Sequence, residues 1–293
     1  MSTGSGFFES VLWKFTLFPI VRLVLALVFV AVPIGLIQVL VKSLGDFPHN
    51  DLVFTCLAVP AAFVAYWGYV RWIEKRSPTE ISLVGAPKEF GRGLLSGAGL
   101  FTTVVGLLWI FGFYHVTGSN GWPILIEAFT VSLMSGFLEE LLTRGIIFRI
   151  LEDVLGTWVA LAISALLFGM MHLGNPHATW TSAVAIALEA GFLLGSCYVL
   201  TRRLWLAIGL HLAWNFTQGG IFGIAVSGTA PNGILRSTLT GPELLSGGQF
   251  GAEASVLAVL VCITGFVFVI TKARKRGHIL SPFWARPSTE HVT

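Results

Sequence analysis

Eight apolar stretches follow one another along this chain, and each is about long enough to cross a lipid bilayer as a helix. A spanning helix needs roughly 20 predominantly apolar residues, and the stretches cover 20–41, 52–71, 94–114, 122–150, 157–173, 182–200, 203–224 and 254–272. Charged residues make up only 11% of the 293 residues, too few to cover the surface of a soluble protein of this length. The sequence therefore predicts an all-α fold, a polytopic transmembrane helical bundle of about eight spans.

The basic residues indicate how such a bundle lies in its membrane. With eight spans, one side receives nearly all of them: Lys14, Arg22, Arg71, Lys75, Arg76, Lys88, Arg92, Arg144, Arg149, Arg202, Arg203, Lys272, Arg274, Lys275 and Arg276. The opposite loops hold chiefly Lys42 and Arg236. Because cytoplasmic loops of membrane proteins are enriched in Lys and Arg, we expect a multi-pass protein of the cell membrane with both termini in the cytoplasm.

No long soluble insert separates the spans, so we expect one membrane domain over 20–272. A cytoplasmic N-terminal segment, 1–19, precedes this domain, and a basic cytoplasmic tail, 273–293, follows it. The tail becomes polar after its basic start, and we expect it to be disordered. The loop 225–253 is rich in Gly, Ser, Thr and Pro, which is compatible with a lid over the outer end of the bundle or with a poorly ordered loop. The basic residues form no patch with interleaved aromatic residues, so nothing points to nucleic acid.

The fourth apolar stretch contains three charged residues, Glu139, Glu140 and Arg144. Each charge near the centre of a bilayer costs about 2.5–3.5 kcal/mol, so their presence needs a reason. On a helix Glu140 and Arg144 lie four residues apart and are expected to pair, whereas Glu139 points about 100° away from Glu140 and should have another role. Ser135 and Gly136, one turn earlier, are small enough for a neighbouring helix to approach closely. The set is either a functional site or an ion pair that fixes helix packing.

Three later stretches add polar residues at helical spacing. Phe168 and His172 lie four apart in the fifth, and Glu189 is a lone acid in the sixth. In the seventh, His211 and Asn215 lie four apart and Gln218 extends the same stripe. Such groups on an apolar helix must face protein or water instead of lipid. A seam of interhelical hydrogen bonds would explain them, and so would a shared site.

Carboxylates and imidazoles on separate helices have a chemical meaning when they meet. A carboxylate and two imidazoles can polarise a water, directly or through a divalent ion, and an amide such as that of Asn215 can stabilise the oxyanion formed when water attacks a carbonyl. This set could hydrolyse an amide bond within a membrane. The chain contains no His-Glu-x-x-His zinc motif, so the ligands of any metal would come from different helices.

Three short motifs occur in order: Glu-Glu-x-x-x-Arg at Glu139, Glu140 and Arg144, Phe-x-x-x-His at Phe168 and His172, and His-x-x-x-Asn at His211 and Asn215. Together, each within a predicted span, they resemble the motifs of the CPBP intramembrane proteases. This family is also called type 2 CAAX prenyl protease or Rce1-like, and it includes bacteriocin-processing and abortive-infection proteins. The resemblance covers about 122–224, which we take as a protease-like core.

The resemblance implies an intramembrane endopeptidase, either metallo- or glutamate-dependent. In that family pattern Glu139 activates water with the help of His172, and His211 with Asn215 binds the oxyanion or a metal-held water. Glu140 and Arg144 support the site, next to Phe168 and Glu189. The resemblance leaves a divalent metal such as zinc open, with the candidate ligands His172 and His211. The substrate would be a peptide or protein, lipid-modified or membrane-embedded.

Two other functions are compatible with the same residues. A non-enzymatic immunity or scaffold protein of this fold would keep the polar cluster for packing, and a proton-coupled transporter would use buried Glu and His as a relay. A transporter typically shows internal repeats and paired helix breaks, which we do not find.

Counting 1.5 Å per residue places Glu139 and His211 in the cytoplasmic half but His172 towards the outer half. We expect the site to face the cytoplasm.

Overall fold

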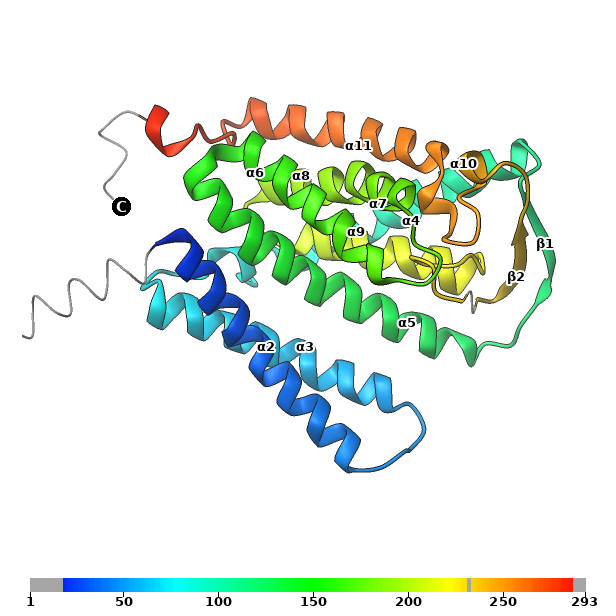
Figure 1. Cartoon of the computed structure of the whole chain (residues 1–293), viewed down its shortest axis with the longest axis horizontal. Helices are drawn as coiled ribbons and strands as arrows, with labels where there is room; N and C mark the ends of the chain where they lie inside the picture. Colours follow the sequence, from blue (N-terminus) through cyan, green and yellow to red (C-terminus); the bar gives the residue numbers. More distant parts are fainter. Residues whose placement is uncertain (1–17, 231–232, 287–293) are drawn as a thin grey trace, which may run out of the picture.

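The computed structural model describes residues 18–230 and 233–286, and Lys14 lies outside this part of the chain. It is a bundle of helices with a two-stranded ribbon at one end (Figure 1). The α-helices are α2 (Pro19–Ser43), α3 (Asn50–Gly68), α4 (Ala86–Ile110), α5 (Ile124–Met134), α6 (Arg149–Met171), α7 (Trp180–Ile186), α8 (Phe192–Thr201), α9 (Trp205–Asn215), α10 (Glu243–Ser246) and α11 (Val256–Lys275). The predicted all-α, polytopic membrane fold is confirmed.

Several helices contain wider, π-helical turns. These are η1 (Tyr69–Ile73), η3 (Ser135–Glu139), η4 (Leu141–Phe148), η6 (Ala187–Gly191) and η7 (Phe216–Ile221), whereas η2 (Thr79–Ile81), η5 (His172–Gly174), η8 (Ala252–Ala254) and η9 (Phe283–Ala285) are short 3₁₀ turns. π-helical turns are rare and frequently lie at functional sites. In this chain η3 and η4 hold the first motif, and η7 directly follows the third.

Six helices are long and apolar enough to cross a membrane within the described residues: Pro19–Ser43, Asn50–Ile73, Ala86–Ile110, Ile124–Gly174, Trp180–Thr201 and Val256–Lys275. Two features explain the difference from the eight predicted stretches. The run Ile124–Gly174 turns sharply at Gly156 (φ 74°, ψ 169°) and therefore supplies two of them. The seventh stretch becomes α9 and η7, which hold 11 and 6 residues and are together shorter than the roughly 20 of a typical span.

The helices that carry the motifs lie inside the bundle. α2 and α3 form a hairpin that extends away from the rest (Figure 1). α4 packs along α9, and α11 packs along α8. One buried apolar cluster, which includes Tyr66, Phe148 and Leu161, lies between α2, α3 and α6. A second, which includes Phe101 and Trp214, lies between α4, α9 and α11. Residues of α9 belong to both clusters, so α9 is packed on two sides, whereas α6 contributes to the first cluster.

The loop 225–253 covers one end of the bundle. Its β2 (Leu235–Leu239) pairs antiparallel with β1 (Tyr114–Ser119), and the register shifts between Val116 and Gly118. Phe250 and Glu253, near the end of this loop, are buried. Apart from 231–232, which are not described, the loop is an ordered cover at this end (Figure 1). The lid alternative therefore fits the described part of the loop, and the poorly ordered alternative does not.

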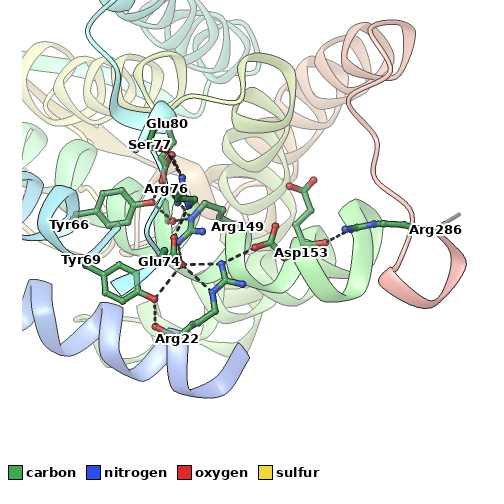
Figure 2. A network of polar contacts seen from close by, with 12 residues as sticks. Arg22, Tyr66, Tyr69, Glu74, Arg76, Ser77, Glu80, Arg149, Asp153 and Arg286 are labelled. Carbon is green, nitrogen blue, oxygen red and sulfur yellow. Dashed lines mark hydrogen bonds and ion pairs between the residues drawn. The ribbon is translucent and has the colours of Figure 1, made fainter. Parts of the chain in front are cut away.

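The other end of the bundle holds the start of α2, the last described residues and a dense network of ion pairs (Figure 2). Glu74 pairs with Arg22 at 2.9 Å, Arg149 at 2.9 Å and Arg76 at 2.7 Å, and Arg76 also pairs with Glu80 at 2.6 Å. Burial would raise the pKa of Glu74, but the three arginines outweigh this effect and lower the pKa to about 2. The network ties α2, α6 and the chain after η1 together.

The expected disorder of the tail is wrong for residues 273–286. The turn at Gly156 interrupts the helix and leaves the N–H of Thr157 without a helical acceptor. This N–H donates to the carbonyl oxygen of Leu280 at 3.0 Å, and the N–H of Leu280 donates to Oγ1 of Thr157 at 2.8 Å. A Cβ at position 156 would lie 2.7 Å from the nitrogen of Pro282, so the close contact requires glycine. The rest of the predicted tail, 287–293, lies outside the described residues.

Candidate active site

Glu140 and Arg144 form the predicted ion pair, and both side chains are almost completely buried, with 0% and 1% exposed. Nη1 of Arg144 lies 2.7 Å from Oε1 of Glu140, and it also donates to Thr143. Nη2 of Arg144 donates to the carbonyl oxygens of Ala190 and Gly191, at 3.0 and 3.2 Å. These carbonyls belong to the π-helical turn η6. The arginine therefore joins the first motif to the helix that carries Glu189.

Both acids of the first motif approach a single imidazole, that of His211. Oε1 of Glu140 lies 2.9 Å from Nδ1, and Oε2 of Glu139 lies 4.0 Å from Nε2. In a regular α-helix the two acids would point about 100° apart. In this structure one π-helical turn ends at Glu139 and the next begins at Leu141, and both acids lie near the same ring. The two acids still differ in position, since Glu140 lies next to Nδ1 and Glu139 lies nearer Nε2.

The hydrogen bond to Glu140 decides how His211 can act. An ionised carboxylate only accepts hydrogen bonds, so Nδ1 of His211 carries the donated hydrogen. Nε2 has no hydrogen bond within the described residues, and neither has the buried Oε2 of Glu139. Their separation of 4.0 Å is too long for a direct hydrogen bond. It is a separation at which a bridging water must be considered.

The second motif joins this group through Phe168. The Phe168 ring lies 4.8 Å from the His172 ring and 6.0 Å from the His211 ring, measured between centroids, and Cζ of Arg144 lies 4.5 Å from its centre. Nδ1 of His172 donates to the carbonyl oxygen of Phe168 at 2.7 Å. A carbonyl oxygen only accepts hydrogen bonds, so Nδ1 of His172 carries the hydrogen. When the ring is neutral, Nε2 therefore has no hydrogen to donate. The three motifs therefore meet around one aromatic ring.

Asn215 completes the contact between the first and third motifs. Its Nδ2 donates to Oγ of Ser135 at 2.9 Å. A Cβ added at Gly136 would lie only 3.0 Å from Cβ of Leu212, so the small residues Ser135 and Gly136 do permit the close approach of η3 and α9 that their size predicts. One hydrogen of the Asn215 amide remains for another acceptor.

A cavity of about 30 Å³ lies beside these groups. Its walls include Phe168, His172, His211 and Asn215, together with Glu189, whereas Glu139 and Glu140 are not among the lining residues. Because a buried water needs roughly 10–15 Å³ of such volume, the cavity has room for one or two waters. Glu189 is 1% exposed and accepts a hydrogen bond from Sγ of Cys262 at 3.8 Å. The sequence prediction of Glu189 as a neighbour of the site agrees with this position.

Two residues of the covering loop close the same cavity, Ser227 and Glu253. The backbone N–H of Ser227 donates to Oε1 of Glu253. Burial raises the pKa of Glu253 to about 7. Sequence reasoning missed both residues because they lie in an irregular loop without helical spacing. The one available signal was an acid directly before the predicted apolar span 254–272.

The predicted metal ligands do not complete a metal site. His172 and His211 both donate from Nδ1, which leaves Nε2 as the nitrogen that could bind an ion, as is usual for metal-binding histidines. A zinc ion typically takes at least three protein ligands. Across residues 18–230 and 233–286, no three His, Cys, Asp or Glu side chains come together closely enough to hold an ion. The donors present therefore do not fit a metal.

The position of the cavity conflicts with the expected side of the site. Ser227 and Glu253 of the loop 225–253 line the cavity, whereas Arg22, Arg76 and Arg149 gather in the ion-pair network at the opposite end of the bundle (Figure 2). Two predictions from the sequence, a cytoplasmic basic end and a site that faces the cytoplasm, therefore do not agree with each other. The residue count placed His172 and His211 in different halves of the membrane. The ring of Phe168, one turn before His172, nevertheless contacts both imidazoles.

Comparison with known proteins bears on the segment that forms this site. Residues 121–217 match the family described as type II CAAX prenyl endopeptidase Rce1-like. This segment is similar to that family. It contains all three motifs, and the resemblance that they indicate is confirmed. The match supports an intramembrane protease as the general class of the protein.

One curated relative and the solved structures complete the comparison. Over 119 residues the chain is 29% identical to a protein of Bacillus subtilis (strain 168) named "Putative membrane peptidase YdiL". The aligned part covers 41% of this chain and 44% of that protein, so the chain spans less than half the length of this relative. No solved structure matches the chain.

Proposed function

We propose that this protein is an intramembrane endopeptidase that hydrolyses a peptide bond with a water activated by Glu139. The observation that carries the proposal is the buried Oε2 of Glu139, which has no hydrogen-bond partner among the described residues and lies 4.0 Å from Nε2 of His211. A buried carboxylate oxygen without a partner is costly. A water between the two atoms removes this cost and is at the same time a nucleophile next to a base.

In the proposed reaction each of these groups has one role. Glu139 takes a proton from the water while the water oxygen attacks the carbonyl carbon of the substrate. The carbonyl oxygen becomes an oxyanion, which the free amide hydrogen of Asn215 and a protonated His211 can stabilise. The carbon–nitrogen bond then breaks, and the departing amine takes the proton from Glu139. His172, which lines the cavity together with His211, assists this proton transfer through Nε2.

Glu140 and Arg144 position the catalytic groups in this proposal. Glu140 holds His211 through Nδ1 at 2.9 Å, which fixes the ring and directs Nε2 towards Glu139. Arg144 balances the charge of Glu140, so that a buried acid can remain ionised. We propose a glutamate-dependent reaction instead of a metal-dependent one, since two imidazoles and one carboxylate are present but are not grouped around a common ion position.

A scaffold protein of the same fold would tie its buried polar groups to one another. In the described residues the second oxygens of both Glu139 and Glu140 have no hydrogen-bond partner. If Glu139 and Glu140 served only for packing, these two unsatisfied oxygens would weaken the fold without serving any function. The unsatisfied atoms favour the enzyme.

We also propose that the protein crosses the cell membrane several times with both termini in the cytoplasm. This orientation is supported by the ion-paired end of the bundle, where Arg22, Arg76 and Arg149 lie together with the last described residues. In this orientation the loop 225–253 and the cavity beneath it lie on the outer side.

The proposal is tested by peptide cleavage with purified protein in lipid vesicles. A peptide mixture is incubated with the wild type and with His172→Ala, and new ends are identified by mass spectrometry. We expect new peptide ends only with the wild type, because His172 is half-buried at a helix end and its loss should leave the fold intact. Identical product patterns from the two proteins would contradict the proposal.

A further inference from the structure

A groove much larger than the cavity lies on the outer surface of the same end, and we call it the outer groove. It has a volume of about 1020 Å³ and is lined by Pro176, Ala178, Gly223, Ala225, Gly228 and Glu243, among others. Clefts that bind ligands typically have volumes of roughly 300–1,000 Å³. The outer groove is thus large enough for a ligand far bigger than a water, which the cavity cannot take.

A single turn of the chain separates the outer groove from the cavity. Ala225 and Gly228 line the groove, whereas Ser227, between them, lines the cavity. Val226 and Thr229 form an isolated bridge that closes this turn. Ser227 has a φ of 48°, a backbone conformation uncommon for residues other than glycine. The turn from Val226 to Thr229 is therefore a thin partition between the groove and the site.

The wall of the outer groove next to the cavity is formed by small residues. The protein's own backbone, at Leu235 and Pro176, fills the positions that side chains would take at Gly223 and Gly228. The N–H of Gly228 and the carbonyl oxygen of Ala225 are hydrogen-bonded within the protein, so an extended peptide along this wall is held through its side chains. Bulky side chains of a ligand must point away from this wall.

The charges around the outer groove favour a basic ligand. The exposed carboxylate of Glu243 borders the groove, and no Lys or Arg among the described residues lines it. Glu243 also borders a neighbouring pocket of about 340 Å³, whose walls include Leu244 and Phe250. A lysine or arginine could place its apolar stem against these two side chains and its charge beside Glu243.

We propose that the outer groove binds the substrate as an extended peptide segment with a Lys or Arg side chain beside Glu243. This inference rests on the proposed protease function and names the class of its substrate. The turn from Val226 to Thr229 must move for the peptide bond to reach Glu139. Continuity between the groove, the turn and the cavity is the reason to assign the groove to the same reaction.

The experiment separates binding from cleavage by using Glu139→Gln, which should bind peptides without hydrolysing them. Random peptides displayed on phage are selected against this variant in lipid nanodiscs. Gln249, an exposed residue of the groove, is changed to cysteine in a Cys56→Ser background and labelled with a bulky maleimide. The matched control carries the same label at position 84, where Val84 is 83% exposed near the ion-paired end.

Selected peptides should be rich in Lys and Arg, and the label at position 249 should abolish their binding while the label at position 84 does not. Glu243→Gln should weaken the binding of a selected peptide about two- to fivefold, the range expected for an exposed ion pair. Three results would overturn the proposal that the outer groove binds the substrate. They are that no peptide is selected, that the selected peptides lack basic residues, or that they bind equally well when position 249 is labelled. If selected peptides bind in the groove but the wild type does not cleave them, the groove stands and the protease proposal fails.

Discussion

Glu140 donates no hydrogen to His211 but accepts one from it, across 2.9 Å between Oε1 and Nδ1. The contact joins a helix near the middle of the chain to one 71 residues later and is completely buried. It determines which nitrogen of His211 faces Glu139. The first and third motifs are therefore one unit in the folded protein.

Removal of Arg144 should destabilise the protein. Arg144→Ala leaves Glu140 buried without a compensating charge, which typically costs about 3–5 kcal/mol. We expect a clearly lower melting temperature in detergent. The double variant Arg144→Met with Glu140→Leu should recover part of the stability, but not cleavage, because His211 loses its acceptor. A melting temperature of Arg144→Ala equal to that of the wild type would show that the ion pair does not support the fold.

Removal of the Asn215 amide should slow the chemical step. Asn215→Leu loses a hydrogen-bond donor to the oxyanion, and the loss of one such donor typically lowers kcat by about 10²–10³. KM should change little, since the oxyanion exists only in the transition state. The matched variant is Ser135→Ala, which removes the oxygen that anchors Asn215 but keeps the amide. A smaller loss is expected for it, and equal losses would mean that Asn215 acts only through its contact with Ser135.

The network in Figure 2 should make the protein sensitive to acid. The pKa of Glu74 falls from 4.5 to about 2, so its contribution to stability is fully present above pH 4.5 and is lost as the pH falls from there towards 2. We expect the melting temperature to decrease over this range. Glu74→Gln should be less stable than the wild type at neutral pH and should show a flatter decrease. A wild-type profile that does not change between pH 5 and pH 3 would contradict the assignment.

The sequence allowed much of the fold and several contacts to be predicted. Apolar stretches identify spanning helices because lipid excludes unpaired backbone groups. The spacing of Glu140 and Arg144 predicts their ion pair. The pair forms although this segment is π-helical instead of α-helical, because the two residues still lie within one turn. The size of Gly136 predicts the close approach of α9. These are local properties of one helix.

Other features depend on contacts between distant segments. The π-helical turns that bring Glu139 and Glu140 to the same imidazole have no composition of their own. Ser227 and Glu253 line the cavity from a loop whose strand β2 pairs with β1, more than 100 residues earlier in the chain. The ordered part of the tail depends on the turn at Gly156, where helix hydrogen bonds are replaced by bonds to Leu280. Helical spacing contains no information about such contacts.

The central claim is that Glu139 is the base that activates water, and its most direct test compares Glu139→Gln with the wild type in lipid. Glutamine keeps the shape of the side chain but cannot accept the proton, so we expect hydrolysis of a cleaved peptide to fall by about 10²–10⁴. The melting temperature should not fall, because a neutral amide is cheaper to bury than a carboxylate. Glu127→Gln is the matched control, since Glu127 lies on α5 of the same long helical run and is exposed. Loss of cleavage in Glu139→Gln alone, with an unchanged melting temperature, is the result that we predict, and undiminished cleavage by Glu139→Gln would contradict the claim.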